Sequence, residues 1–210
     1  MARAHRVQIP GMPHHVIQRG VDRTDIFRSG ADYAFLLARL RSAAATHHTD
    51  VHTYVLMTNH LHLLVTPRTE TALSKMMKSI GETYAGYFNR VYKRTGALFD
   101  GRYRSLVVDS EAYWFTCMRY VELNPVRAGM VVAPEDYRWS SYRAHAFGAP
   151  DDLIVPHPMF LALGRTDALR QMCWRAICGE ALSEGELTEI RDLVHRGRRP
   201  KGVRPQLTGV

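Results

Sequence analysis

Two histidines stand two residues apart in an otherwise apolar stretch, TNHLHLLV at residues 58–65. If this stretch is a β-strand, its period of two places His60 and His62 on one face and the intervening leucines on the other. Two imidazoles on one face can bind a single divalent ion, because neutral imidazole is a common metal ligand. A histidine pair on a strand is more often only a half-exposed polar face. The pattern therefore predicts a metal site only if other residues support it.

A second candidate group is MRYVELNPVRAGMV, residues 118–131, in which Tyr120 and Asn124 are four residues apart. On a helix this spacing places both side chains on one face. A metal held by two imidazoles and an amide oxygen keeps open positions, and a phosphate bound there becomes more electrophilic. A phenol on that face is a suitable nucleophile, although a core tyrosine is the alternative. Tyr113 precedes Cys117 by four residues, and a thiol is a poor Mg²⁺ ligand, so we favour Tyr120.

The remaining histidines and cysteines show no comparable pattern. The three cysteines include no CxxC pair, which indicates buried small side chains in a reducing compartment rather than a zinc site or a redox dithiol. We interpret five further histidines as surface or local polar residues: His14, His15, His47, His48 and His52.

The chain of 210 residues carries a formal charge of +8, and arginine outnumbers lysine several-fold. Guanidinium groups suit bidentate contacts with phosphate, and positive charge favours a polyanionic partner. No apolar run approaches the ~20 residues that span a bilayer, and the basic N-terminal stretch lacks the apolar region of a secretory signal. We therefore expect a cytoplasmic protein that does not enter a membrane.

Hydrophobic periodicity predicts an α+β fold. Leucine, methionine and aromatic residues recur at helical spacing in two segments, and four segments read as strands. The first 125 residues thus follow the order β-α-β-β-α-β and then a helix, which is typical of a ferredoxin-like antiparallel sheet with two helices on one face. The expected strands are 14–19, 50–57, 60–67 and 102–109, and the expected helices are about 31–47, 70–92 and 111–124.

Five stretches of the chain resemble the single-tyrosine HUH transposases, in particular the REP-associated tyrosine transposases of bacteria. The resemblance covers about residues 5–148, and together the five stretches are highly specific. One departure is RGVDR at residues 19–23, where RGNxR is common, in a loop expected to face DNA. The stretches are IPGMPHHVIQRGVDR, LMTNHLHLLV, KRTGALFDGRYRSLVVDSEAY, RYVELNPVRAGMV and YRWSSYRAHAFG.

The resemblance implies a ferredoxin-like catalytic domain that acts on single-stranded DNA, often recognised as a hairpin. His60 and His62 would bind Mg²⁺ or Mn²⁺, with Asn124 as third ligand where related transposases carry glutamine. Tyr120 would attack the scissile phosphate to give a 5′-phosphotyrosine and a free 3′-OH, and a later 3′-OH would reverse the step. The family includes monomers and homodimers, and both remain open here. A hairpin-binding regulator without cleavage is the alternative function.

Basic residues interleaved with aromatic ones suit unpaired nucleic acid, although each could equally belong to a solvated surface. An RRM-type domain would instead expose aromatic residues where this sheet has histidines.

We assign residues 1–148 to the catalytic domain and 149–210 to a helical extension with a basic tail, RGRRPKG. The extension is either a DNA-binding element or a helix pair packed on the core. The candidate DNA contacts are Arg19, Arg23, Lys93, Arg94, Arg102, Arg104 and Arg127.

Overall fold

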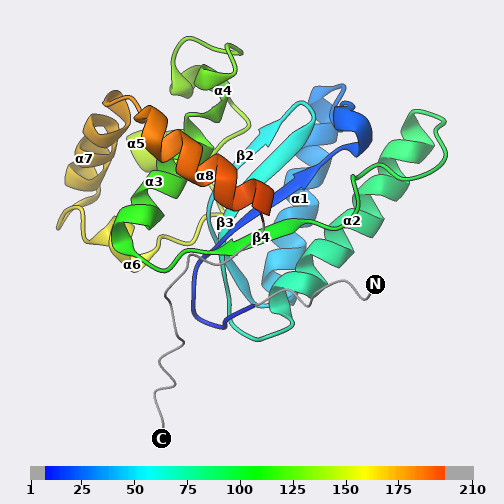
Figure 1. Cartoon of the computed structure of the whole chain (residues 1–210), viewed down its shortest axis with the longest axis horizontal. Helices are drawn as coiled ribbons and strands as arrows, with labels where there is room; N and C mark the ends of the chain where they lie inside the picture. The colour runs from blue at the N-terminus through cyan, green and yellow to red at the C-terminus, as the bar shows by residue number, and fades with distance from the viewer. Residues whose placement is uncertain (1–7, 197–210) are drawn as a thin grey trace, which may run out of the picture.

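The computed structural model describes residues 8–196, and its centre is one four-stranded antiparallel sheet in the order β2-β3-β1-β4. This order and the β-α-β-β-α-β succession confirm the predicted ferredoxin-like fold. Helices α1 (Gly30–Thr46) and α2 (Ala72–Val91) lie on one side of the sheet, and α3 (Glu111–Glu122) and α8 (Glu184–Arg196) lie on the other (Figure 1). The strands are β1 (His14–Arg19), β2 (Thr49–Met57), β3 (His60–Pro67) and β4 (Arg104–Val107).

The alternation of β3 divides the sheet into two faces. Leu61, Leu63 and Val65 are buried in the main core under the two long helices. Thr58-Asn59 joins β2 to β3 directly, which fixes the register that turns the histidines to the opposite face. The helices covering the leucine face are α1 (Gly30–Thr46) and α2 (Ala72–Val91).

The second face is covered by helices that follow β4. The predicted helix 111–124 ends earlier than expected, at Glu122, because Pro125 lacks the backbone N–H that would continue it, and a new short helix begins at Asn124. The predicted strand 102–109 is also shorter, spanning only β4. These elements are α3 (Glu111–Glu122), α4 (Asn124–Arg127), α5 (Tyr142–Phe147), α6 (Pro158–Leu161), α7 (Asp167–Gly179) and α8 (Glu184–Arg196), with short 3₁₀ turns at Val21–Arg23 and Pro134–Asp136.

The segment after residue 148 packs on the sheet domain. Trp174 of α7 is fully buried in a cluster with Leu64 of β3 and Trp114 of α3. Leu187 and Ile190 of α8 contact α3 in the same way. The helices of this segment are therefore packed on the core, as one of the two alternatives expects, and this packing does not test the other alternative, a DNA-binding element. Residues 197–202 of the predicted basic tail lie outside the described part of the chain.

The loop after β1 has a tight backbone. Gly20 approaches the next residues so closely that a Cβ would overlap the Thr24 carbonyl oxygen and the Ile26 side chain. Asp22 and Arg23 have φ values of 50° and 59°, in the left-handed region. This turn is the RGVDR stretch of the sequence, and its shape brings residues of the loop to the edge of the histidine face.

Within residues 8–196, none of the helices combines the length and the apolar character needed to cross a bilayer.

Candidate active site

The predicted histidine pair and the predicted tyrosine helix meet at one open cleft. His60, His62, Tyr120 and Asn124 all line it, and its volume is about 620 Å³. The two imidazole rings lie 4.9 Å apart, centroid to centroid. His62 is almost fully buried, whereas His60 is half-buried at the end of the strand. The structure therefore brings together all four residues that the sequence singled out for chemistry.

Tyr120 lies between the sheet and the C-terminal helix. Its ring centroid is 5.6 Å from that of His62, edge to face. The Arg127 guanidinium lies 4.0 Å from the ring centroid, and its Nη1 donates a hydrogen bond to the Tyr120 carbonyl at 3.2 Å. On its other side the ring contacts Leu187 and Ile190 of α8, which leaves the residue 8% exposed. The ring is thus held firmly, with access to the cleft but little to bulk solvent.

His15 is a site residue that sequence reasoning missed. Our interpretation of it as a surface or local polar residue is wrong, because it is fully buried and its Nε2 lies 3.0 Å from His62 Nδ1. Its ring also stacks on His62 and meets Tyr120 edge to face. The contact arises because β1 and β3 are sheet neighbours, with His15 opposite Leu64. The contact depends on the pairing of β1 with β3, which brings together two residues 47 positions apart in the chain, so the local sequence does not reveal it.

His14 and His52 are also buried, so neither is the surface residue that was one of the two interpretations from the sequence. His14 makes local contacts, with its Nδ1 2.7 Å from the Met12 carbonyl. His52 instead joins distant segments, because its ring nitrogens lie 2.7 Å from the Val155 carbonyl and 2.8 Å from Thr66 Oγ1. His47 and His48 are partly or fully exposed, as interpreted from the sequence.

Burial keeps the imidazoles of the cleft neutral. Desolvation lowers the pKa of His15 and of His60 to about 4, and the positive charge of Arg19 and Arg127 adds to the effect at His60. The pKa of His62 lies well below its usual value, for the same reasons. A neutral imidazole has a free lone pair, which a metal ligand requires.

We expect the free energy of unfolding of the metal-free protein to fall as the pH decreases from about 6.5 to about 4. The folded pKa of His15 and His60 is about 4, below the unfolded value, so the unfolded chain binds more protons in this window. The stability is fully present above about pH 6.5 and is lost as the pH falls through about 4. Urea unfolding across this range measures the effect, and His15→Phe should show a shallower dependence. A flat profile in the wild-type protein would contradict the assignment.

The donor atoms of the cleft fit a divalent metal ion such as Mn²⁺ or Mg²⁺. In residues 8–196, no three His, Cys, Asp or Glu side chains converge on one point, so a metal here depends on the Asn124 amide or on water and phosphate as further ligands. Two neutral imidazoles with oxygen ligands suit Mn²⁺, and Mg²⁺ where the oxygens dominate. His60, His62 and Asn124 would hold such an ion.

A family model described as "Transposase IS200 like" matches residues 8–124, which is more than half of the chain. The chain belongs to the IS200-like transposase family. The match spans the sheet, the histidine pair and Tyr120, and it ends at Asn124. The family resemblance noted in the sequence is thereby confirmed.

One solved structure agrees with the fold of this transposase. A structure described as a REP-associated tyrosine transposase bound to a REP hairpin has a TM-score of 0.56 at 15% identity, covering 75% of this chain and 93% of its own. A Deinococcus radiodurans structure described as a transposase has a TM-score of 0.40 at 17% identity, covering 53% of this chain and 89% of its own. A comparison with curated protein sequences found no match.

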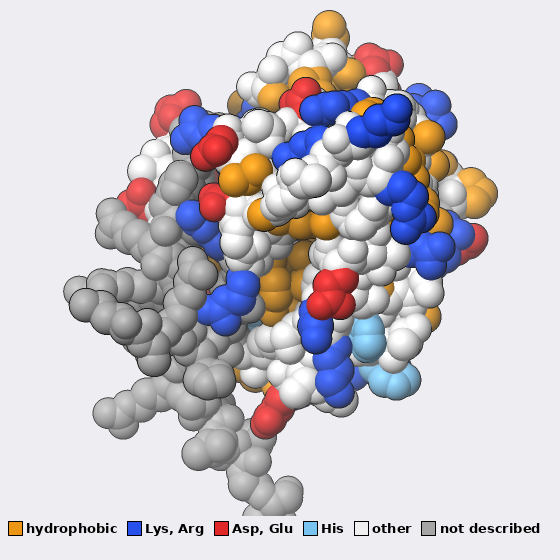
Figure 2. All heavy atoms as spheres, turned by 90° about the vertical axis from the view of Figure 1, so that its right-hand side faces the viewer, with side chains coloured by type: hydrophobic (Ala, Val, Ile, Leu, Met, Phe, Trp, Pro, Cys, Tyr) orange, Lys and Arg blue, Asp and Glu red, His pale blue; other side chains and the backbone are white. Residues whose placement is uncertain are grey.

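The transposase concentrates some of its predicted DNA-binding residues at the cleft. Arg19, Arg23, Arg102 and Arg104 line it, together with two acidic residues that sequence reasoning did not single out, Asp22 and Asp100. Lys93 and Arg94 are not among the residues that line the cleft; Arg94 lies over the Phe88 ring on α2. Seen from the α2 side, lysine and arginine side chains form separate groups with apolar side chains between them (Figure 2).

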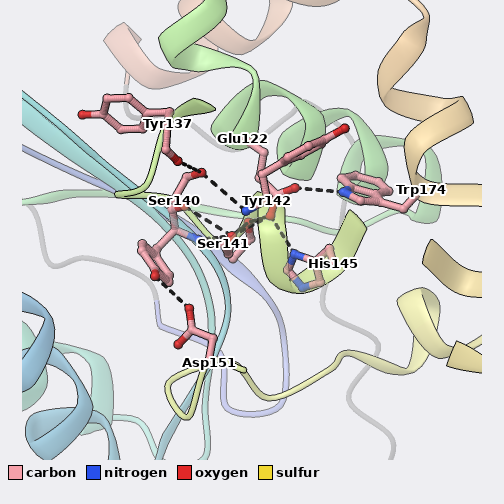
Figure 3. Close-up of polar contacts among 10 residues, drawn as sticks. Glu122, Tyr137, Ser140, Ser141, Tyr142, His145, Asp151 and Trp174 are labelled. Carbon is pink, nitrogen blue, oxygen red and sulfur yellow. Dashed lines mark hydrogen bonds and ion pairs between the residues drawn. The ribbon is translucent and has the colours of Figure 1, made fainter. Parts of the chain in front are cut away.

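A buried carboxylate fixes the helix that carries Tyr120. Glu122 is fully buried, and its Oε1 accepts hydrogen bonds from Thr53 Oγ1 (2.9 Å), Ser141 Oγ (2.5 Å) and His145 Nδ1 (2.6 Å). Its Oε2 accepts one from Trp174 Nε1 at 2.8 Å. The donors come from β2, from the residue before α5, from α5 and from α7. Figure 3 shows Ser141, His145 and Trp174 around the Glu122 carboxylate. The end of α3 is thereby tied to three other elements.

Proposed function

We propose that this transposase is a metal-dependent single-stranded DNA endonuclease and strand transferase that acts through Tyr120. One observation carries the proposal: His60, His62, Tyr120 and Asn124, which lie on two separate parts of the chain, line one cleft. A phenol beside neutral imidazoles and an amide oxygen is the donor set that phosphoryl transfer to tyrosine needs. The substrate would be single-stranded DNA flanked by a hairpin; a hairpin partner is supported by the similar structure, which is described as bound to a REP hairpin.

Each residue has a defined role in this proposal. A Mg²⁺ or Mn²⁺ ion held by His60, His62 and Asn124 would polarise the scissile phosphate. The Tyr120 phenol loses its proton and its oxygen forms a bond to phosphorus, while the bond from phosphorus to the 3′ oxygen breaks and that oxygen gains a proton. The products are a 5′-phosphotyrosine and a free 3′-OH. Because the phosphodiester energy is kept in the covalent link, attack by another 3′-OH rejoins DNA without a nucleotide cofactor.

A second candidate is a regulator that binds hairpin DNA with little or no cleavage. The observation that favours it is the burial of Tyr120, which is only 8% exposed and contacts α8 on one side. A nucleophile that rarely reaches DNA would leave binding as the main activity.

The experiment that separates the two is a search for the covalent product. Purified protein is incubated with end-labelled hairpin DNA carrying single-stranded flanks and Mn²⁺, then denatured and run on a gel. A labelled band at the mass of protein plus DNA supports the transferase. Tight binding in a gel-shift assay without any such band supports the regulator.

We expect Arg102→Ala to weaken hairpin DNA binding and to reduce the slope of log affinity against log salt by about 1, because one phosphate contact is lost. Arg102 is exposed and lines the cleft. Arg94→Ala is the matched control, since Arg94 carries the same charge but does not line the cleft. Fluorescence anisotropy over a salt series measures both. Equal slopes for the two variants would argue against DNA in this cleft.

A further inference from the structure

Both histidines of the cleft have a second polar group placed against the same ring nitrogen. His62 Nδ1 lies 3.0 Å from Nε2 of His15, and His60 Nδ1 lies 2.6 Å from Oδ1 of Asn59. A neutral imidazole carries one N–H and one lone pair, so the partner of Nδ1 decides which nitrogen is left to bind a metal. His15 and Asn59 come from different elements, β1 and the β2–β3 turn, yet they meet equivalent atoms.

At His60 the donor and acceptor are fixed by the Asn59 amide. Asn59 Nδ2 donates a hydrogen bond to the Arg23 carbonyl at 3.0 Å, so its Oδ1 is the atom turned to His60. An amide oxygen only accepts. His60 therefore carries its proton on Nδ1, and its Nε2 keeps the lone pair.

At His62 the same outcome follows if His15 accepts. The two ring nitrogens are at hydrogen-bonding distance and both residues are buried, so one nitrogen must donate and the other accept. The 23° angle between the stacked rings and the edge of Tyr120 hold His15 in place. When His15 Nε2 accepts, His62 carries its proton on Nδ1 and presents Nε2, as His60 does. His15 then carries its own proton on Nδ1, a buried atom with no hydrogen-bond partner among the described residues, whereas the opposite direction would leave only a lone pair there. The tautomer of His62 is therefore the point that the spectra decide.

We propose that His15 and Asn59 are positioning residues that hold His62 and His60 in the tautomer protonated on Nδ1, so that Nε2 of each ring is the metal ligand. The proposal rests on the metal site of the proposed function. Hydrogen-bonded groups behind metal-binding histidines commonly fix the ring in this way, and their loss typically lowers metal affinity about 10- to 100-fold. The competing explanation is that the two residues only fill space behind the histidines.

The tautomers can be read without any metal or DNA. Long-range ¹H–¹⁵N spectra of the full-length metal-free protein distinguish a protonated Nδ1 from a protonated Nε2 in each histidine. We expect the Nδ1–H form at both His60 and His62. Asn59→Leu should release His60 alone and His15→Phe should release His62 alone, because each replacement keeps most of the volume and removes the acceptor. A protonated Nε2 at either histidine of the wild-type protein would refute the role of its partner, Asn59 for His60 or His15 for His62, and a protonated Nε2 at both would overturn the whole proposal.

Metal affinity gives the second readout, with free Mn²⁺ measured by electron paramagnetic resonance. We expect His15→Phe and Asn59→Leu to weaken Mn²⁺ binding about 10- to 100-fold. His15→Gln and Asn59→Asp should recover most of it, because their side-chain oxygens can accept from Nδ1. His52→Phe is the matched control, since it removes another buried strand imidazole that bonds to Val155 and Thr66, away from the cleft.

The possible failures are distinguishable. If the wild-type protein binds no Mn²⁺, the proposed metal site is wrong, and the spectra still test whether His15 and Asn59 set the tautomers. If it binds Mn²⁺ and the Phe and Leu variants bind it equally well, with unchanged spectra and unchanged thermal unfolding, the positioning roles are refuted. Recovery by Gln and Asp, but not by Phe and Leu, would exclude a role in space-filling alone.

Discussion

Tyr120→Phe is expected to lower the rate of covalent protein–DNA product formation by about 10³-fold or more, because removal of a nucleophile leaves only residual catalysis. The replacement deletes a single oxygen. Its ring can still pack against His62, Arg127 and Leu187, so the fold and the cleft should be kept. Hairpin binding should remain nearly intact. A labelled hairpin with Mn²⁺, denaturing gels for the product and anisotropy for binding together measure the change.

Tyr113→Phe is the matched control. Tyr113 is on the same helix and also packs near α8, but it is not among the residues that line the cleft with the histidines. We expect this variant to form the covalent product at close to the wild-type rate. Loss of the product in Tyr113→Phe with full retention in Tyr120→Phe would show that the nucleophile is misassigned.

Local patterns were enough to predict the elements that position the site. The alternation of β3 follows from strand geometry, because a period of two separates the histidines from Leu61 and Leu63, which enter the main core under α1 and α2. Tyr120 and Asn124 are four residues apart, about one helical turn, and both side chains reach the cleft although α3 ends at Glu122 and a new helix begins at Asn124. Features that depend on the spacing of a few neighbouring residues could therefore be predicted from the sequence.

Contacts between distant segments could not be predicted from the sequence. His15 enters the site only because β1 pairs with β3, and nothing near residue 15 signals that partner. Arg94 and Arg102 are both basic residues near one loop, yet only Arg102 lines the cleft. Their placement is decided by where the chain turns between α2 and β4, which charge patterning does not encode. The burial of Glu122 could not be predicted either. The helical pattern places Glu122 on α3, but it does not indicate which distant residues donate hydrogen bonds to the carboxylate.

Glu122→Ala is expected to destabilise the protein so strongly that little folded material remains. The variant leaves the buried donors of His145 and Trp174 without an acceptor, whereas Thr53 and Ser141 keep each other and the Tyr54 carbonyl as partners. Each unsatisfied buried group costs about 1–3 kcal/mol and the cavity adds to this, so the loss is a large part of the ~5–15 kcal/mol by which a typical domain is stable. Urea unfolding and soluble yield measure this loss. Glu111→Ala is the control, because Glu111 is exposed on the same helix and should change stability by no more than about 0.5 kcal/mol.

Two more conservative variants, Glu122→Gln and Trp174→Phe, test the geometry of the hydrogen bonds around Glu122. Glu122→Gln keeps the shape, and its best orientation leaves Oε1 for three donors and turns the amide NH₂ toward the Trp174 indole N–H. Two donors then face each other, which costs free energy that Trp174→Phe should partly relieve. We therefore expect the double variant to be more stable than the sum of the two single effects by about 1 kcal/mol. Strict additivity would mean that the carboxylate does not act as the common acceptor that fixes the helix carrying Tyr120.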